Sequence, residues 1–177
     1  MKKELRDLIP EFDLISDGEL REKTLAVWER ALEQGGWQPS DLLRMPFTLA
    51  IPKAAANLVE HVRANALMCS EMERAFRQIY GDRVKINRDH LIAGALLHDV
   101  GKAVEFKEED GKWAKSKSGR YLRHAFSGVG LCYMEGIPEE VIHIVAVHSR
   151  EGEGAKRSVE AIILHHSDFT NFESFMP

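Results

Sequence analysis

Apolar residues recur at intervals of three and four along most of this chain, which is the pattern of amphipathic helices. Ser16 or Asp17 can cap the first of these segments, and Gly81 ends the longest one. The pattern predicts helices over residues 17–34, 54–80 (starting at about Ala54), 89–99, 124–135, 138–149 and 158–169. We therefore expect an all-α fold, a bundle of roughly six to eight helices.

One predicted helix is apolar nearly all round. Residues 89–99 read DHLIAGALLHD, so this helix is expected to lie in the middle of the core. It ends in His98 and Asp99, and a carboxylate beside a histidine at the end of a buried helix is costly unless something compensates it. A metal ion, a salt bridge and a helix-cap arrangement are the three compensators that this doublet allows.

The helical pattern breaks between residues 103 and 122. Two short stretches that favour β-structure flank the turn signal Asp110-Gly111, and this predicts one small β-hairpin near residues 104–114. Five basic residues follow the turn and lead up to His124: Lys112, Lys115, Lys117, Arg120 and Arg123. This run is either an ordinary solvated loop or a lid that attracts phosphate.

Length and composition fit an ordinary globular protein. The chain has 177 residues, is 44% hydrophobic and carries a net charge of −4, which argues against a general nucleic-acid binder. It holds two cysteines, no apolar stretch long enough to span a membrane and no secretory signal, so we expect a cytoplasmic protein. We expect residues 1–50 to form a helical extension and residues 51–177 the main domain.

Histidine is the residue that points to chemistry, because the chain has eight of them. Four histidines and two aspartates, from five different helices, lie at or near apolar segments: His61, His98, Asp99, His124, His148 and Asp168. Imidazole and carboxylate together suit Mn, Fe, Co, Ni or Zn. Six ligands exceed the needs of one tetrahedral ion and are about right for two ions that share a carboxylate. We assign structural or supporting roles to His90, His143, His165 and His166.

The order of these residues resembles a known family. The string LLHDVGK at residues 96–102 is followed by RHAFSG, VAVHS and LHHSD, and this succession is similar to that of the HD-domain superfamily of metal-dependent phosphohydrolases. The resemblance runs from about Leu58 to Phe172 and leaves residues 1–50 without a match. It implies the HD-domain helical bundle as the fold.

The resemblance also implies a role for each motif residue. His61, His98, Asp99 and Asp168 resemble the ligands of a first metal, and His124 and His148 those of a second, with Asp99 bridging the two. Lys102, in HDVGK, resembles a lysine that faces the substrate phosphate. We thus expect two divalent ions (Mn, Fe, Co, Ni or Mg), Asp99 and Lys102 as catalytic residues, and Lys102, Arg120 and Arg123 as phosphate-binding residues.

Three functions remain open. The first is hydrolysis of a phosphoester of a nucleotide or another small phosphorylated metabolite by a metal-bridged hydroxide. The second is a di-iron oxygenase, because some members of the superfamily resemble this chain in their six ligands and activate oxygen. The third is a binding or signalling module in which the metals only hold the fold together. The Gly-Tyr-Pro motif of the cyclic-dinucleotide phosphodiesterases is missing after His148, where the chain reads HSREGEG, so the sequence does not predict that activity.

Overall fold

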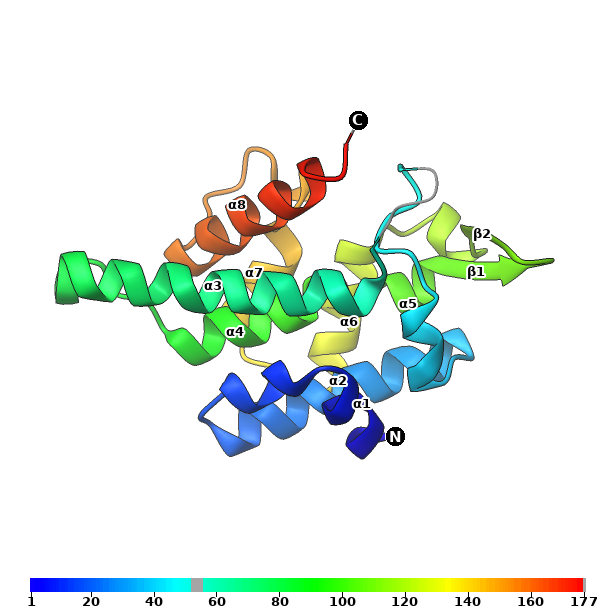
Figure 1. Ribbon diagram of the computed structural model, residues 1–177, viewed down its shortest axis with the longest axis horizontal. Coiled ribbons are helices and arrows are strands. Elements are labelled where there is room, and N and C mark those ends of the chain that lie inside the picture. The colour runs from blue at the N-terminus through cyan, green and yellow to red at the C-terminus, as the bar shows by residue number, and fades with distance from the viewer. Residues whose placement is uncertain (52–55, 177) are drawn as a thin grey trace.

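The longest helix, α3, runs across the molecule, and α4 and α8 pack along it (Figure 1). The computed structural model describes residues 1–51 and 56–176. Within these residues the α-helices are α1 (Lys2–Leu8), α2 (Gly18–Gly35), α3 (Leu58–Tyr80), α4 (Arg88–Leu97), α5 (Lys102–Glu105), α6 (His124–Met134), α7 (Glu139–Val147) and α8 (Val159–Glu173). The prediction of an all-α fold with one small hairpin is confirmed.

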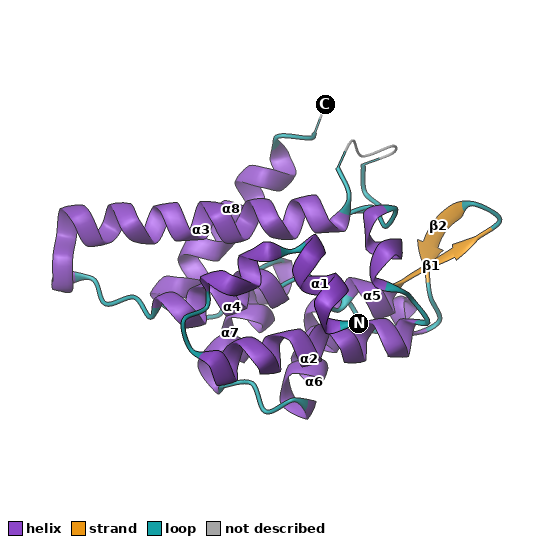
Figure 2. Cartoon of the chain, turned by 60° about the horizontal axis from the view of Figure 1, so that its bottom comes forward, coloured by secondary structure: helices purple, strands orange, loops and turns teal. Residues whose placement is uncertain are grey.

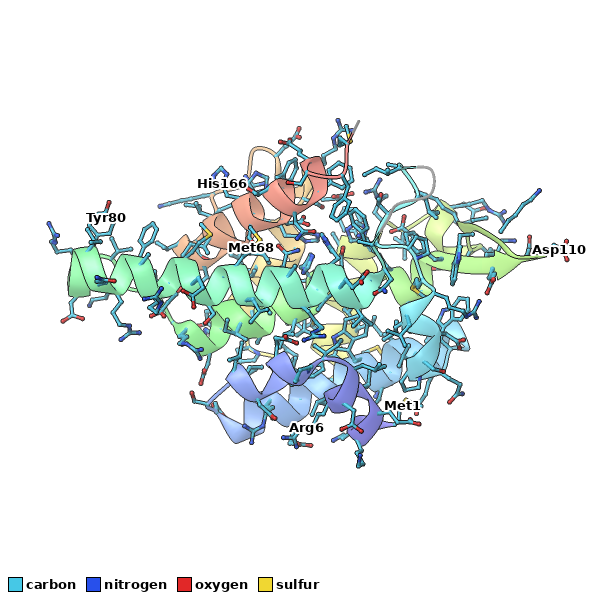
Figure 3. All side chains as sticks on the ribbon, in the orientation of Figure 1. Met1, Arg6, Met68, Tyr80, Asp110 and His166 are labelled. Carbon is cyan, nitrogen blue, oxygen red and sulfur yellow. The ribbon has the colours of Figure 1, made fainter. Side chains whose placement is uncertain are left out.

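The hairpin has its turn where the sequence predicts it. Strand β1 (Phe106–Glu109) pairs antiparallel with β2 (Lys112–Lys115), and Asp110 and Gly111 between them both have positive φ, as a two-residue hairpin turn requires. The hairpin projects from one end of the helical body (Figure 2), and Asp110 lies at its far tip (Figure 3).

Helix α3 begins later than its apolar pattern suggests. The expected start at Ala54 lies outside the described residues, but Ala56 and Asn57 are not helical. Asn57 accepts a hydrogen bond from the backbone N–H of Glu60, and the Glu60 carboxylate accepts one from the N–H of Asn57. This capping box explains why the helix starts at Leu58.

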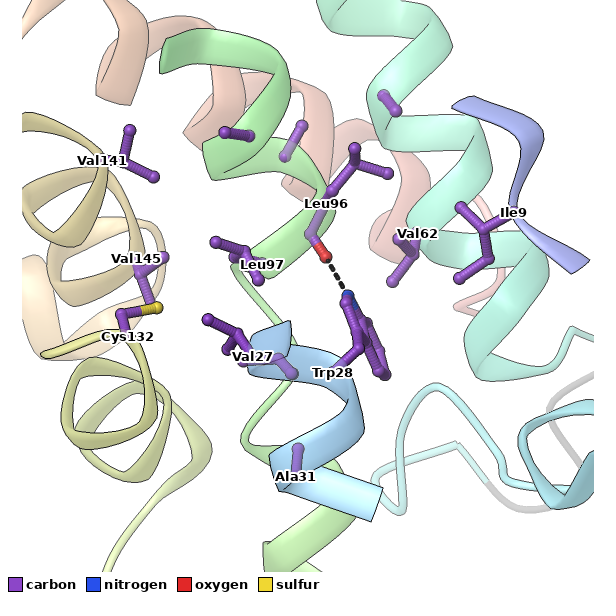
Figure 4. Close-up of a cluster of buried hydrophobic side chains, with 14 of the residues drawn as sticks. Ile9, Val27, Trp28, Ala31, Val62, Leu96, Leu97, Cys132, Val141 and Val145 are labelled. Atoms are coloured by element: carbon purple, nitrogen blue, oxygen red, sulfur yellow. Dashed lines mark hydrogen bonds between the residues drawn. The ribbon is translucent and has the colours of Figure 1, made fainter. Parts of the chain in front are cut away.

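Helix α4 lies at the centre of the core, as its apolar sequence predicts. It packs against α2, α3, α7 and α8, and every residue from Leu91 to Leu97 is buried. The indole Nε1–H of Trp28 in α2 donates a hydrogen bond of 2.9 Å to the carbonyl of Leu96 (Figure 4). The first 50 residues therefore share the core with the rest of the chain, and its division at residue 50 stays a prediction.

Within the described residues, no helix has both the length and the apolarity that crossing a membrane would require.

Candidate metal centre

Five segments bring the predicted ligands together inside the helical body. His61 lies in the first turn of α3, His124 opens α6, and Asp168 lies in the middle of α8. His98 and His148 are the residues at which α4 and α7 end, and Asp99 follows His98 directly. All but Asp168 are buried, and the side chain of Asp168 is 14% exposed.

One set of atoms gathers around one oxygen of Asp99, and we call it the first ligand group. Asp99 Oδ2 lies 3.2 Å from His61 Nε2 and 3.4 Å from His98 Nε2, and these two nitrogens are 3.3 Å apart. Asp168 Oδ1 adds a fourth donor, 3.0 Å from His61 Nε2 and 3.7 Å from His98 Nε2.

The other oxygen of Asp99 faces a different pair of imidazoles, and we call this set the second ligand group. Asp99 Oδ1 lies 3.3 Å from His124 Nε2 and 3.9 Å from His148 Nε2, and the two nitrogens are 3.3 Å apart. Asp99 is therefore the residue that the two groups have in common.

Both groups have the spacing of a coordination sphere. Donor atoms about 2.1 Å from one ion lie about 3.0–3.4 Å from each other at the angles of octahedral or tetrahedral geometry. The donor atoms of His61, His98 and Asp99 all lie within 4.8 Å of one another, and so do those of Asp99, His124 and His148. The donors are imidazole nitrogens and carboxylate oxygens, which suit a divalent transition metal. The residues present thus fit an ion in each group.

Each of the four imidazoles is held by its outer nitrogen. The Nδ1–H of His98 donates to the carbonyl of Ala95 and that of His148 to the carbonyl of Val145, both at 2.7 Å. His61 Nδ1 is 2.8 Å from Asn171 Oδ1. His124 Nδ1 is 3.0 Å from Glu105 Oε2. Because the Nδ1 proton points to an oxygen, the Nε2 atom of each ring faces Asp99, and in the neutral ring its lone pair can bind a metal.

Burial and the nearby charges shift the pKa values in this cluster in opposite directions. Burial lowers the pKa of His61, but hydrogen bonds to Asp168 and Asp99 outweigh it and raise the pKa to about 9. Burial and repulsion from His98 and His124 lower the pKa of His148 to about 3. Burial disfavours the ionised form of Asp99, yet Lys102 and His98 hold the pKa of its carboxyl well below the usual range.

The three predicted phosphate-binding residues lie in different surroundings. The ammonium of Lys102 is buried and donates to Asp99 Oδ2 and to the carbonyl of Phe47, both at 2.5 Å. Arg123 is half exposed, and its Nε lies 3.3 Å from Glu151 Oε1. Arg120 is exposed, and no ion pair of its guanidinium is found in the part of the chain that the structure describes.

Three contributors to the centre were missed in the sequence. Glu105 and Asn171 each hold a ring, and the Phe47 ring stacks on His61 with centroids 4.8 Å apart. Asn171 lies three residues after Asp168, so the helical period places both residues on one face. This spacing is a sequence signal that indicates Asn171 as a neighbour of the centre. Glu105 and Phe47 have no such signal, because only the fold brings them to the histidines.

The four remaining histidines take no part in either ligand group. His165 Nδ1 contacts the carbonyl of His148 at 2.6 Å, and His143 Nε2 accepts the N–H of Ser158 at 3.2 Å. His166 is exposed on the outside of α8 (Figure 3), and the side chain of His90 is partly exposed near the start of α4. Their structural or supporting roles stay a prediction.

Comparison with known proteins places this centre in context. Residues 58–170 match the HD domain family. Over 113 residues the chain is 35% identical to a protein of Methanocaldococcus jannaschii named dihydroneopterin 2′,3′-cyclic phosphate phosphodiesterase. The matched segment is 63% of this chain and 44% of that relative, so the chain spans less than half of the relative's length. No solved structure matches the chain significantly.

Proposed function

The chain belongs to the HD domain family, and we propose that it is a metal-dependent phosphohydrolase that cleaves a phosphoester of a nucleotide or another small phosphorylated metabolite. The observation that carries this proposal is the position of Asp99, whose two carboxylate oxygens face two different pairs of imidazoles. A carboxylate placed in this way can bridge two divalent ions, which is the arrangement of two-metal phosphoester hydrolysis.

Two divalent ions held here would lower the pKa of a bound water toward neutrality and would take up charge from the phosphoryl oxygens. The chain's own contribution is to fix the donors before substrate arrives. Four of them, the Nε2 atoms of the ligand histidines, are oriented by hydrogen bonds on the opposite side of each ring. Because this orientation is set in advance, binding requires little rearrangement of the protein.

Positive side chains near the centre support a substrate that carries phosphate. Lys102 donates to the same Asp99 oxygen that faces His61 and His98, so its ammonium is within reach of an anion bound at that position. Arg123 directly precedes the ligand His124 and is half exposed, so it can meet a substrate from solvent. We propose that these two residues, with Arg120 farther out, hold the phosphate.

The name of the Methanocaldococcus relative suggests which phosphoester to test first. That relative is named as a phosphodiesterase of a 2′,3′-cyclic phosphate. We therefore propose small cyclic phosphodiesters as the first substrate class and linear phosphomonoesters as the second.

The test is turnover by protein stripped with a chelator and reloaded with Mn, Fe, Co, Ni or Mg in turn. We expect hydrolysis of a 2′,3′-cyclic phosphodiester or of a small phosphomonoester only in reloaded samples. Asp99→Asn should abolish it, and Asp82→Asn, which changes an exposed aspartate beyond the end of α3, should not. Hydrolysis that survives Asp99→Asn would contradict the mechanism.

The two other candidate functions predict different results in the same samples. A di-iron oxygenase would purify with iron and consume oxygen in the presence of an organic substrate. A non-catalytic module would show a melting temperature that depends on metal, with no turnover of any phosphoester. Metal content, oxygen uptake and phosphate release measured side by side separate the three.

A further inference from the structure

Glu105 is a buried carboxylate that stands outside both ligand groups. It ends the short helix α5, six residues after Asp99, and is only 3% exposed. A buried carboxylate is costly unless it is fully partnered. Its partners therefore indicate what it does.

The two oxygens of Glu105 have different partners. Oε2 accepts two hydrogen bonds from one residue, at 2.6 Å from the backbone N–H of His124 and at 3.0 Å from its ring Nδ1–H. Oε1 lies 3.3 Å from Lys115 Nζ and 4.0 Å from Arg123 Nε. One carboxylate thus holds both the backbone and the ring of His124 and also contacts two basic side chains, Lys115 of β2 and Arg123 just before α6.

Among the residues that the structure describes, no other ligand histidine is held by a charged group on its outer nitrogen. His98 and His148 donate to backbone carbonyls, and His61 is paired with the neutral amide of Asn171. A carboxylate fixes the orientation of an imidazole and makes its other nitrogen more basic than a neutral acceptor does. The second ligand group also has fewer donors than the first, so it depends more on each one.

The loop after the hairpin packs closely against Glu105 and forms a hydrogen bond with its backbone. The N–H of Ser116 donates to the Glu105 carbonyl at 2.8 Å. A Cβ atom built on Gly119 would lie 2.2 Å from that carbonyl oxygen and 2.8 Å from Glu105 Cγ. Only glycine permits this approach, so the loop and the carboxylate are fitted to each other.

From this geometry we infer that Glu105 is a positioning residue for the second ligand group: it orients His124 for an ion bound there, and the absence of a side chain at Gly119 leaves room for it. The inference rests on the proposed two-metal centre. It predicts that a defect at Glu105 or Gly119 weakens the second ion selectively and leaves the first ion in place.

The experiment is a titration of the metal-free full chain with Co²⁺. Calorimetry and the visible absorption of the bound ion monitor the binding. The wild type should bind two ions. Glu105→Gln, which keeps the size of the side chain, should weaken the second ion by roughly 10–100-fold and change its absorption spectrum, with the first ion unaffected. The matched control is Glu73→Gln, because Glu73 is equally buried and ion-paired but contacts Arg77 and Arg88.

A second variant tests the same inference without removing the carboxylate. Gly119→Ala should displace Glu105 and weaken the second ion in the same direction by a smaller factor. Its control is Gly130→Ala, because a Cβ on Gly130 meets no atom within 4 Å. Circular dichroism and melting curves of all four variants establish that they are folded.

The outcomes distinguish this inference from the proposed function. If folded Glu105→Gln binds both ions as tightly as the wild type, or loses both ions equally, Glu105 does not position the second ligand group, and the proposed hydrolysis is untouched. A wild type that binds a single ion would overturn the two-metal centre and with it this inference, whereas metal-dependent hydrolysis is tested separately by turnover. A wild type that binds two ions, with the second weakened by Glu105→Gln, supports the inference even if no phosphoester is hydrolysed.

Discussion

The two ligand groups share Asp99 but differ in their construction. The first group draws its donors from α3, α4 and α8 and includes Asp168 as a fourth donor. The second has two imidazoles and one carboxylate oxygen, and its His124 is braced by a residue next to the hairpin. A group with fewer protein donors leaves more positions for water or substrate. We therefore expect the first group to hold its ion more firmly and the second to leave more coordination positions open.

Removing the shared carboxylate should have the largest effect. Asp99→Ala takes a donor from both groups at once and leaves the buried ammonium of Lys102 without its carboxylate partner. We expect the number of ions per chain to fall from two to none and hydrolysis to fall by at least about 10³-fold, because metals supply several kcal/mol of charge stabilisation. Elemental analysis of the reloaded variant checks this. Two ions retained would mean that Asp99 bridges nothing.

Removing a donor that belongs to only one group should release the ion of that group and leave the other ion bound. Asp168→Ala changes only the first group and His148→Ala only the second, so each should leave about one ion per chain. The double variant should hold none. Elemental analysis and Co²⁺ titration measure both. If either single variant released both ions, the two groups would act as one site rather than as two.

The pH should affect the first group more than the second. The pKa of His61 is about 9 in the metal-free protein, above its ordinary value of 6.5. The protonated ring therefore stabilises the fold below pH 6.5, and this contribution is lost as the pH rises from 6.5 to about 9. Metal needs the neutral ring, so an ion in the first group must displace this proton.

The measurable consequence is that the affinity for the first ion should change more steeply with pH than the affinity for the second. Affinity for the first ion should rise by up to about tenfold per pH unit between pH 6.5 and 9 through His61. His148, with a pKa of about 3, is already neutral there and adds nothing to the slope for the second ion. Calorimetric titrations at four pH values, in Asp168→Ala and in His148→Ala, follow each ion alone. Equal slopes would contradict this prediction.

The smallest effect should come from the support behind the centre. Trp28→Phe removes the hydrogen bond to the Leu96 carbonyl, two residues before His98, and should cost about 1–2 kcal/mol of unfolding free energy. Thermal melting should shift by a few degrees, about 2–4 °C per kcal/mol for a chain of this size. Both ions should still bind. Loss of either ion would show that α2 positions the ligands directly rather than only stabilising α4.

Most elements of the fold can be predicted from short-range patterns in the sequence. Apolar periodicity predicts most of the helices, and the pair Asp110-Gly111 predicts the hairpin, because both signals depend on residues close together in the chain. The apolar pattern predicts a start of α3 that is too early, because apolar residues also precede Asn57, where the capping box with Glu60 begins the helix. The short helices α1 and α5 were not assigned individually, because segments of 7 and 4 residues contain too few turns for a helical period to show.

The sequence by itself determined which residues are candidates for metal binding: four histidines and two aspartates, in an order that resembles a known family. Only the tertiary structure decided that the two oxygens of Asp99 face different histidine pairs, and that Glu105, Asn171 and Phe47 support them. The physical reason is that a ligand's identity is a local property, whereas its orientation depends on hydrogen bonds from elements that meet only when the core has formed.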